Sequence, residues 1–199
     1  MFESLSISIT NRMERSGVFS PDEKEIYQYG IQQILLTFLN LVTVAIIGLL
    51  LGAFRNLLIF TIAYIPLRKM AGGFHAKTPI RCYVVSTAMF VFVALVPRWI
   101  SIGAFETTIL LLVFSVVIIA LAPVGSANKP LDDLEKKVYK KRAVVICAVE
   151  VIAALVFLHL SVQVVADGIF WAVTMVLVLL LLGKLHYRQV VSNRNSHIE

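Results

Sequence analysis

A histidine and a cysteine stand seven positions apart in the segment RKMAGGFHAKTPIRC, which lies between two apolar stretches of the chain. They are His75 and Cys82. A thiol within hydrogen-bonding reach of an imidazole is an activated nucleophile, because the imidazole can take the thiol proton. Lys77 and Arg81 lie in the same segment, and nearby cations favour the reactive thiolate. The residue types therefore indicate nucleophilic catalysis by a cysteine with a histidine base.

A helix is expected to begin at Pro79, because proline suits the first turn of a helix but cannot continue one from upstream. Thr78 is then the N-cap. Cys82 falls in the first turn, where the positive end of the helix dipole lowers the pKa of a thiol.

Two glycines before the histidine, Gly72 and Gly73, indicate a tight turn where a Cβ atom would clash. On one continuous helix His75 would lie ~10 Å along the axis from Cys82, too far to share a proton. A break at residues 78–79 lets the chain fold back, so the break is what would bring the two side chains together.

Each of these residues also has a plainer explanation. A cysteine in a membrane protein is most often a small packing residue, and we expect this of Cys147, which lies inside an apolar stretch. A histidine near a membrane surface often only contacts lipid headgroups, and two glycines often only form a turn. Two ligands are too few for zinc, so we expect no metal and no cofactor.

The elements that must position these residues are membrane helices. Of the 199 residues, 59% are hydrophobic and 15% are charged, whereas a soluble domain has about 25% charged residues. The apolar residues form blocks of ~17–25, long enough to cross the hydrocarbon as helices. We predict an all-α, polytopic membrane protein with a single domain over residues 1–199. The net charge of +6 is explained by basic cytoplasmic loops, so no nucleic-acid partner is expected.

About six membrane-spanning helices are predicted, after a helix over residues 1–20 that would lie on the membrane surface. Apolar residues at positions 5, 7 and 9 would also suit a strand. No signal peptide is expected. A helix should begin at Pro21, with Ser20 and Glu23 forming a capping box. The predicted apolar spans are 31–54, 57–67, 79–96, 107–122, 143–160 and 168–182.

Lysines and arginines collect in every second connection between the predicted spans. The segments 68–82 and 123–142 and the tail from Lys184 are basic, whereas the alternate connections hold only Arg55 and Arg98. The positive-inside rule then places the basic segments and both termini in the cytoplasm. Segment 68–82 is thus predicted to be a cytoplasmic catalytic loop and helix start.

Arg68, the GGFHA core and Cys82 resemble the AgrB family, the membrane cysteine peptidases of Gram-positive bacteria that mature quorum-sensing peptides. The segment APVGSANKPLDDLE is similar to the family's Pro-Val…Asn-Lys-Pro segment after the fourth span. The six-span layout and the length also match, so the resemblance covers nearly the whole chain.

The resemblance implies a cysteine endopeptidase of the cell membrane whose substrate is an AgrD-like propeptide. Cys82 would attack the carbonyl at the end of the signal segment and release the C-terminal tail, with His75 as the base. A cysteine of the bound peptide would then displace Cys82 and close a thiolactone ring. The partners are then the propeptide and the lipid bilayer, and a homodimer is left open.

Other residues have weaker candidate roles. Arg68 would hold a substrate carboxylate or stabilise an oxyanion, unless it is only a snorkelling charge. The basic loop that contains Lys129 would attract an acidic propeptide tail, or would only mark the topology. Asp132 or Asp133 would orient the histidine, because the sequence holds no carboxylate between positions 25 and 106. Glu150 lies inside an apolar span, where a carboxylate is a candidate functional residue.

A different class of protein is the alternative. In a small membrane transporter or peptide-export channel, Glu150, His159 and the short second span would line a path. A non-catalytic membrane scaffold is the third hypothesis. Cleavage of a co-expressed propeptide would separate the peptidase from both.

Overall fold

The computed structural model describes residues 2–74, 78–100, 102–124 and 132–195, and nearly all of them are helical. The predicted all-α class is confirmed. The helices are α1 (Phe2–Arg15), the short 3-10 helix η1 (Pro21–Glu23), α2 (Lys24–Leu50), α3 (Phe54–Ala71), α4 (Pro79–Leu95), the short 3-10 helix η2 (Val96–Arg98), α5 (Ala104–Leu121), α6 (Asp133–His159) and α7 (Gln163–Asn195).

Five segments within the described residues are long and apolar enough to cross a membrane: Lys24–Leu50, Pro79–Arg98, Ala104–Leu121, Asp133–His159 and Gln163–Leu185. The chain is therefore a multi-pass membrane protein. The sixth long helix is α3, which has 18 residues and carries Arg55 near its start and Arg68 and Lys69 near its end. Its apolar centre matches the short second span predicted at 57–67, and the helix extends beyond it at both ends.

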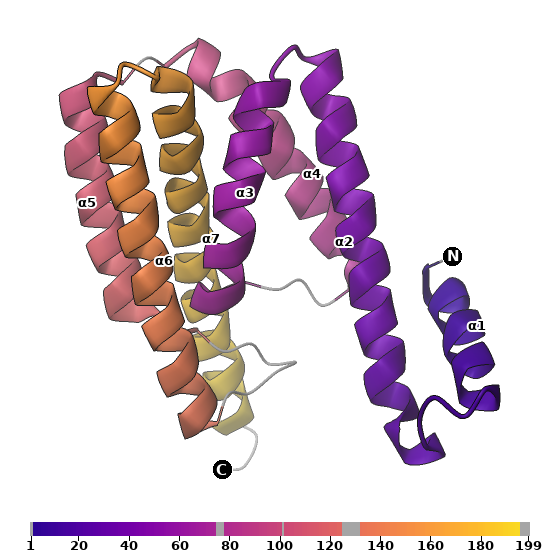
Figure 1. Ribbon diagram of the computed structural model, residues 1–199. Helices are drawn as coiled ribbons and strands as arrows, with labels where there is room; N and C mark the ends of the chain where they lie inside the picture. The colour runs from indigo at the N-terminus through magenta and orange to yellow at the C-terminus, as the bar shows by residue number, and fades with distance from the viewer. Residues whose placement is uncertain (1, 75–77, 101, 125–131, 196–199) are drawn as a thin grey trace.

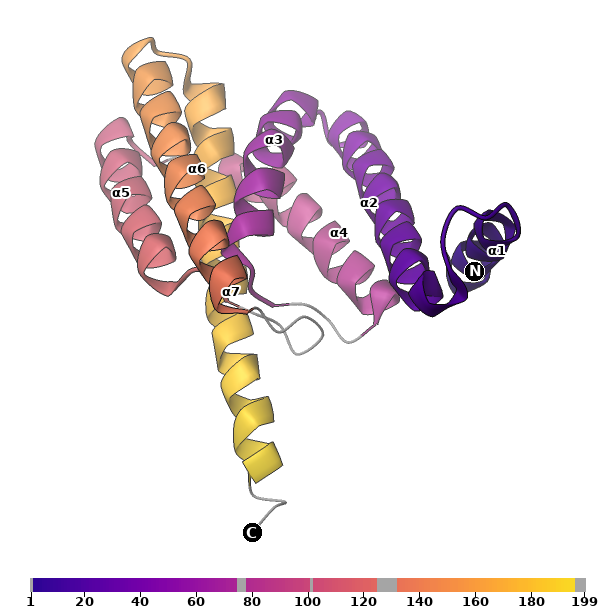
Figure 2. The same cartoon turned by 60° about the horizontal axis from the view of Figure 1, so that its bottom comes forward.

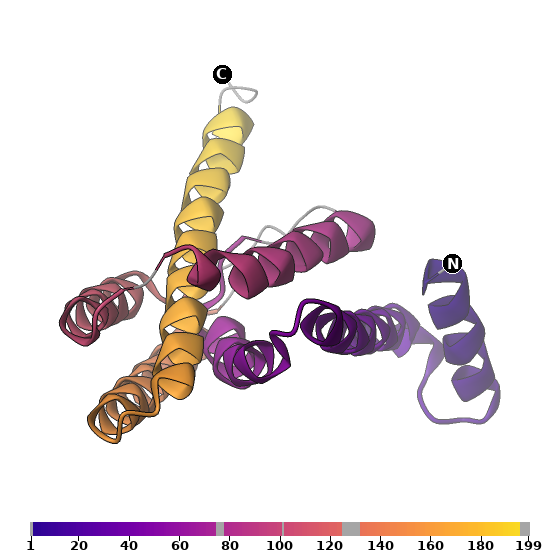
Figure 3. The ribbon, with the colours of Figure 1, turned by 90° about the horizontal axis from the view of Figure 1, so that it is seen from above.

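Helix α7 is the centre of the bundle. Figures 1 and 3 show α3, α5 and α6 arranged around it, and Figure 2 shows its last turns extending past the ends of its neighbours. The core contains fully buried large side chains from several helices, among them Phe60, Leu111, Ile118, Val176 and Leu180. Fully buried alanines lie in α6 and α7, and small residues of this kind let membrane helices approach closely.

Helices α2 and α4 lie on the far side of α3 from α5 and α6, and they contact each other (Figure 3). A hydrogen bond of 2.9 Å between the hydroxyls of Thr43 and Tyr83 joins them. Their outer faces expose large apolar side chains, for example Phe38, Leu50 and Val84. This exposure is expected for faces that contact lipid.

The helix ends fall into two groups. One end of the molecule (lower part of Figure 1) holds the starts of α2, α4 and α6 and the ends of α3, α5 and α7. We call this the site end, because Cys82 lies there. The turns after α2, α4 and α6 lie at the opposite end (Figure 1). The up-and-down arrangement agrees with the alternation of basic and non-basic connections, and the assignment of the site end to the cytoplasm stays a prediction.

The N-terminal segment is a helix, so the strand alternative for residues 5–9 is wrong. It packs against the first half of α2, with the side chains of Ser6 and Thr10 fully buried. An ion pair of 2.6 Å between Lys24 and Glu14 closes the hairpin. The position of α1 on a membrane surface stays a prediction.

The predicted start at Pro21 is confirmed in part. The Ser20 backbone N–H donates to the Glu23 carboxylate at 3.2 Å, as a capping box requires. The Ser20 hydroxyl also bonds this carboxylate at 3.2 Å and caps no backbone N–H. The chain therefore enters α2 through a 3-10 turn, and the α-helix begins at Lys24.

Candidate active site

The end of α3 is tied into a turn by Arg68. The two terminal nitrogens of its guanidinium donate to the carbonyl oxygens of Gly72 and Phe74. Gly72 and Gly73 have φ angles of 73° and 118°, a region that residues with a Cβ rarely adopt. The glycine pair therefore forms the tight turn that the sequence predicts. Arg68 is in addition the clamp of this turn, which is a role the sequence does not reveal.

The turn is also fixed from outside, by α7 and by the segment after α5. The Phe74 N–H donates to the Leu179 carbonyl of α7 at 2.8 Å, and the Gly73 N–H donates to the Val124 carbonyl at 3.2 Å. In return, the Val124 N–H donates to the Ala71 carbonyl at 2.9 Å. Residues 71–74, which we call the glycine turn, are thus held by three backbone hydrogen bonds to distant parts of the chain.

Close backbone approach explains the glycines of this region. A Cβ atom on Gly73 would lie 2.8 Å from the Leu179 carbonyl oxygen and 2.6 Å from a guanidinium nitrogen of Arg68. One on Gly183 of α7 would meet the backbone of Gly73 and Phe74 even more closely. Gly183 is therefore part of the candidate site. Sequence reasoning missed it, because a glycine within an apolar helix gives no signal of its partner.

Cys82 lies where the sequence predicts, in the first turn of α4. Pro79 is the first helical residue, and the Thr78 hydroxyl accepts from the Arg81 N–H at 3.4 Å. The Cys82 N–H bonds to the Thr78 carbonyl at 3.1 Å, so the thiol is on the first closed turn. The predicted N-cap at Thr78 is confirmed. The Cys82 side chain is half-buried and forms no disulfide, whereas Cys147 in α6 is fully buried.

Among the described residues, Arg68 is a cation that acts electrostatically on the Cys82 thiol. The sequence assigned this role to Arg81 and Lys77, and the role of Lys77 stays a prediction. The Arg81 side chain is exposed, at the start of α4. Because Arg68 is bonded to the glycine turn, this one side chain links the turn and the end of α3 to Cys82.

Tyr64 is a further member of this cluster. It lies one helical turn before Arg68 in α3, and its phenol interacts electrostatically with the Arg68 guanidinium and with Cys82. Its ring stacks on the fully buried ring of Phe60 at a centroid distance of 5.2 Å. The sequence signal that could have identified Tyr64 is the spacing of four between positions 60, 64 and 68, because residues four apart lie on the same face of a helix.

Three predicted site residues, His75, Lys77 and Lys129, lie outside the described residues. The pairing of His75 with Cys82 therefore stays a prediction. The described neighbours fix both sides of the short segment that holds His75, since Phe74 is bonded to α7 and Thr78 caps α4.

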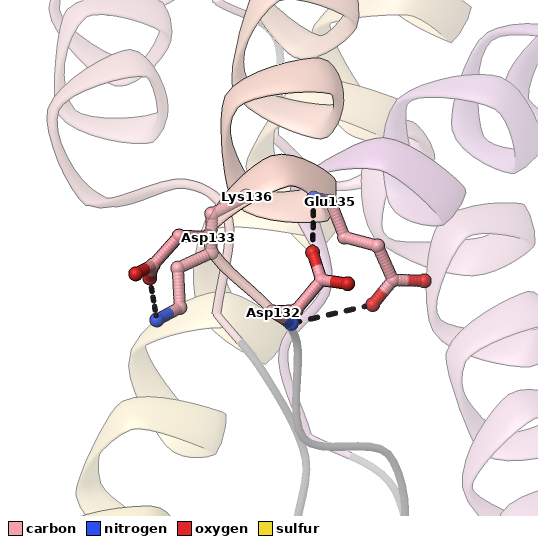
Figure 4. A network of polar contacts seen from close by, with 4 residues as sticks. All are labelled: Asp132, Asp133, Glu135 and Lys136. Carbon is pink, nitrogen blue, oxygen red and sulfur yellow. Dashed lines mark hydrogen bonds and ion pairs between the residues drawn. The ribbon is translucent and has the colours of Figure 1, made fainter.

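The two aspartates before α6 have local partners (Figure 4). Asp132 is the N-cap of α6: its carboxylate accepts from the Glu135 N–H at 2.6 Å, and its own N–H donates to the Glu135 carboxylate at 3.4 Å. Asp133 forms an exposed ion pair of 3.0 Å with Lys136. Both carboxylates thus take part in starting the helix, and an orienting role for either one stays a prediction.

Glu150 is buried in α6, and its two carboxylate oxygens have no hydrogen-bond partner within the described ranges. Glu150 thus lies within a long apolar helix, as the sequence predicts, and a functional role for it stays a prediction. Within the described residues, no hydrogen bond joins the Glu150 carboxylate to the glycine turn or to the first turn of α4.

Comparison with known proteins agrees with this arrangement. The sequence model of the family described as "AgrB: Accessory gene regulator B" matches residues 6–181. An AgrB-like protein of Clostridium perfringens strain SM101 is 29% identical over 149 residues, which is 71% of this chain and 70% of that protein. Protein FsrB of Enterococcus faecalis is 32% identical over 108 residues, 53% of this chain and 45% of that protein. Accessory gene regulator protein B of Staphylococcus aureus is 29% identical over 102 residues, 51% of this chain and 54% of that protein. No solved structure shows a significant match to the chain.

Proposed function

The chain belongs to the AgrB family, and on that premise we propose that it is a membrane cysteine endopeptidase that matures an AgrD-like propeptide for quorum sensing. The observation that carries the proposal is the position of Cys82. Its half-buried thiol lies in the first turn of α4, and Arg68, which is bonded to the fixed glycine turn, interacts with it electrostatically. A helix N-terminus and a neighbouring cation both favour a thiolate.

The reaction begins with proton transfer. His75 takes the proton of the Cys82 thiol, and the sulfur attacks the carbonyl carbon of the propeptide at the end of the signal segment. When the tetrahedral intermediate collapses, the C–N bond breaks and His75 returns the proton to the leaving amine. The C-terminal tail leaves with a new amino terminus, and the signal segment stays bound to Cys82 as a thioester.

The second step is thioester exchange. A cysteine thiol within the bound peptide loses its proton and attacks the thioester carbonyl, and the Cys82 sulfur leaves and is protonated again. The product is a thiolactone, so the acyl-transfer potential of the thioester is conserved. Attack by water would discard it, and a thiol half-buried among packed helices limits the access of water.

Arg68 supports this chemistry through the position of the glycine turn. Its two donating nitrogens are bonded to backbone carbonyls of the turn, so they are engaged without substrate. We infer that Arg68 holds the turn that carries His75 and supplies a positive charge near Cys82. The carboxylate-binding, oxyanion-stabilising and snorkelling roles that the sequence left open stay predictions beside this one.

The cytoplasmic face is the expected location of the site. Arg68, Lys69 and Arg81 lie at the site end, and this end also holds the basic start of α6. Basic residues flanking membrane helices remain on the cytoplasmic side. A propeptide made in the cytoplasm would then reach Cys82 without crossing the membrane.

The test is processing of a co-expressed AgrD-like propeptide that carries a C-terminal tag. Cys82→Ala is expected to abolish release of the tagged tail, whereas Cys147→Ala, which changes a fully buried thiol in α6, is expected to leave it nearly intact. Equal amounts of both variants in the membrane fraction are the control. Release of the tail by Cys82→Ala at the wild-type rate would overturn the proposal, and would favour a transporter or a scaffold.

A further inference from the structure

A cavity of about 300 Å³ lies at the opposite end of the molecule from Cys82. Its walls come from the connection between α4 and α5, the first turn of α5 and the first turns of α7. Pro97, Ile100 and Ile102 supply apolar walls. None of the residues of the proposed peptidase site lines it.

The cavity has a negative wall. Asp167 of α7 lines it, and one of its carboxylate oxygens accepts from the Gln163 side chain at 3.2 Å. Within the described ranges, no lysine or arginine forms an ion pair with Asp167. The nearest cation on the α4–α5 connection is Arg98, and it donates to the Leu51 carbonyl. A second carboxylate, that of Glu106, lies directly against Gly103 of the cavity wall.

A hydroxyl in the wall is left without a partner. The Thr107 side chain is 1% exposed, and its Oγ1 atom has no hydrogen-bond partner within the part of the chain that the structure describes. A buried polar group without a partner costs free energy of ~1–3 kcal/mol. Thr107 belongs to the cavity wall, but its oxygen is too deeply buried to be reached by a ligand.

Two aromatic rings complete the cavity. Phe170 and Trp171 lie edge to face at a centroid distance of 5.5 Å, and Trp171 is held in turn by Phe92 at 5.9 Å. Both line the cavity. The face of an indole ring attracts a cation through its quadrupole. The contacts with Phe170 and Phe92 hold the Trp171 ring in one orientation, so the part of the cavity wall that it forms is preorganised.

We propose that this cavity binds a primary organic ammonium group that carries a short apolar chain. Asp167 neutralises the charge, Trp171 contacts the cation, and the apolar wall packs against the chain. The same chemistry is offered by a free amine and by the ethanolamine headgroup of a phospholipid. The inference does not use Cys82, so its failure would leave the proposed peptidase unaffected.

The chain contains two tryptophans, which makes a direct test feasible. Trp99 is 86% exposed, so Trp99→Phe leaves Trp171 as the only tryptophan without disturbing the core. The full-length Trp99→Phe protein in phosphatidylglycerol nanodiscs is titrated with n-butylammonium while Trp171 fluorescence is recorded. n-Butanol and butyrate are the neutral and anionic probes of similar size. We expect a saturable change with butylammonium only.

Two variants in the Trp99→Phe background assign the binding to this cavity. Asp167→Asn is expected to raise the butylammonium concentration at half-saturation about tenfold or more, because a charge-assisted hydrogen bond is lost. Asp22→Asn changes an exposed carboxylate in η1 and is expected to have no effect. Unchanged Trp171 emission without the probe checks that each variant is folded.

A second set of nanodiscs, containing phosphatidylethanolamine, separates the two sources of the ammonium group. A higher half-saturation concentration in these discs identifies the ethanolamine headgroup as a competing occupant, and an unchanged value identifies a free amine as the ligand. A response to butanol equal to that of butylammonium would overturn the proposal. So would a wild-type titration curve for Asp167→Asn.

Discussion

Gly183 of α7 lies directly against Gly73 at the end of α3, so closely that a methyl group on Gly183 would meet the backbone of Gly73 and Phe74. The neighbouring Phe74 N–H bonds to the Leu179 carbonyl, one turn earlier in α7. Helix α7 therefore serves as the support on which the glycine turn rests. The residue after Phe74 is His75, so this support fixes one side of the segment that would carry the catalytic base.

Gly183→Ala is expected to reduce propeptide processing at least tenfold, because backbone atoms cannot swing away from the added methyl group as a side chain could. The measurement is the rate of tail release in a membrane fraction with equal amounts of enzyme. Gly30→Ala is the matched control, since nothing lies within 4 Å of an added Cβ there. Equal rates for the Gly183 and Gly30 variants would show that the turn does not depend on α7.

Arg68→Lys is expected to lower processing at least tenfold although the positive charge remains. Arginine donates to the Gly72 and Phe74 carbonyls at once, and a single ammonium group cannot reproduce this forked geometry. The matched control is Arg55→Lys, which alters an exposed arginine near the start of the same helix. Full activity of Arg68→Lys would mean that only the charge matters and that the clamp is dispensable.

Tyr64→Phe tests the phenol of the cluster. The variant keeps the ring that stacks on Phe60 and removes the hydroxyl that interacts with Arg68. We expect a three- to tenfold decrease in processing and a slower reaction of Cys82 with iodoacetamide. Tyr83→Phe is the comparison, because Tyr83 directly follows Cys82 but bonds Thr43. If the two variants behave alike in both measurements, Tyr64 does not position the site.

His75→Ala is expected to lower processing severely and also to slow alkylation of Cys82 near neutral pH. The substitution removes the proton acceptor and, when the imidazole is protonated, one positive charge that favours the thiolate. The measurement is the rate of iodoacetamide modification in the Cys147→Ala background, where Cys82 is the only thiol. Arg81→Ala is the control, and it should slow alkylation less because an exposed charge is screened by water and salt. Alkylation of His75→Ala at the wild-type rate would mean that the two residues are not coupled before substrate binds.

The orientation of the site end is tested by labelling. A membrane-impermeant thiol reagent is expected to modify Cys82 in inside-out vesicles and not in intact cells, because basic residues mark the cytoplasmic side. Cys147 is fully buried and should stay unlabelled in both preparations. Modification of Cys82 from outside intact cells would reverse the predicted topology.

Features that depend on neighbours along the chain could be predicted from the sequence. The apolar blocks indicate the membrane helices, since each block satisfies its backbone internally and only its length and composition matter. Thr78 and Pro79 indicate the start of α4, because capping and proline geometry are local. The motif around Gly72, Gly73 and Cys82 indicates the family, and the family model confirms it.

Features that depend on packing between distant segments were decided only by the tertiary structure. Gly183 and Gly73 stand far apart in the sequence, and no local pattern indicates that their backbones meet. The bonds of Arg68 to the Gly72 and Phe74 carbonyls depend on where the chain turns after α3, so the sequence did not indicate them. The same holds for Thr107 and Asp167, which share a cavity because α5 and α7 pack side by side. Hydropathy and motifs thus determined which segments are helices and where the nucleophile stands, whereas close packing between helices decided which side chains surround it.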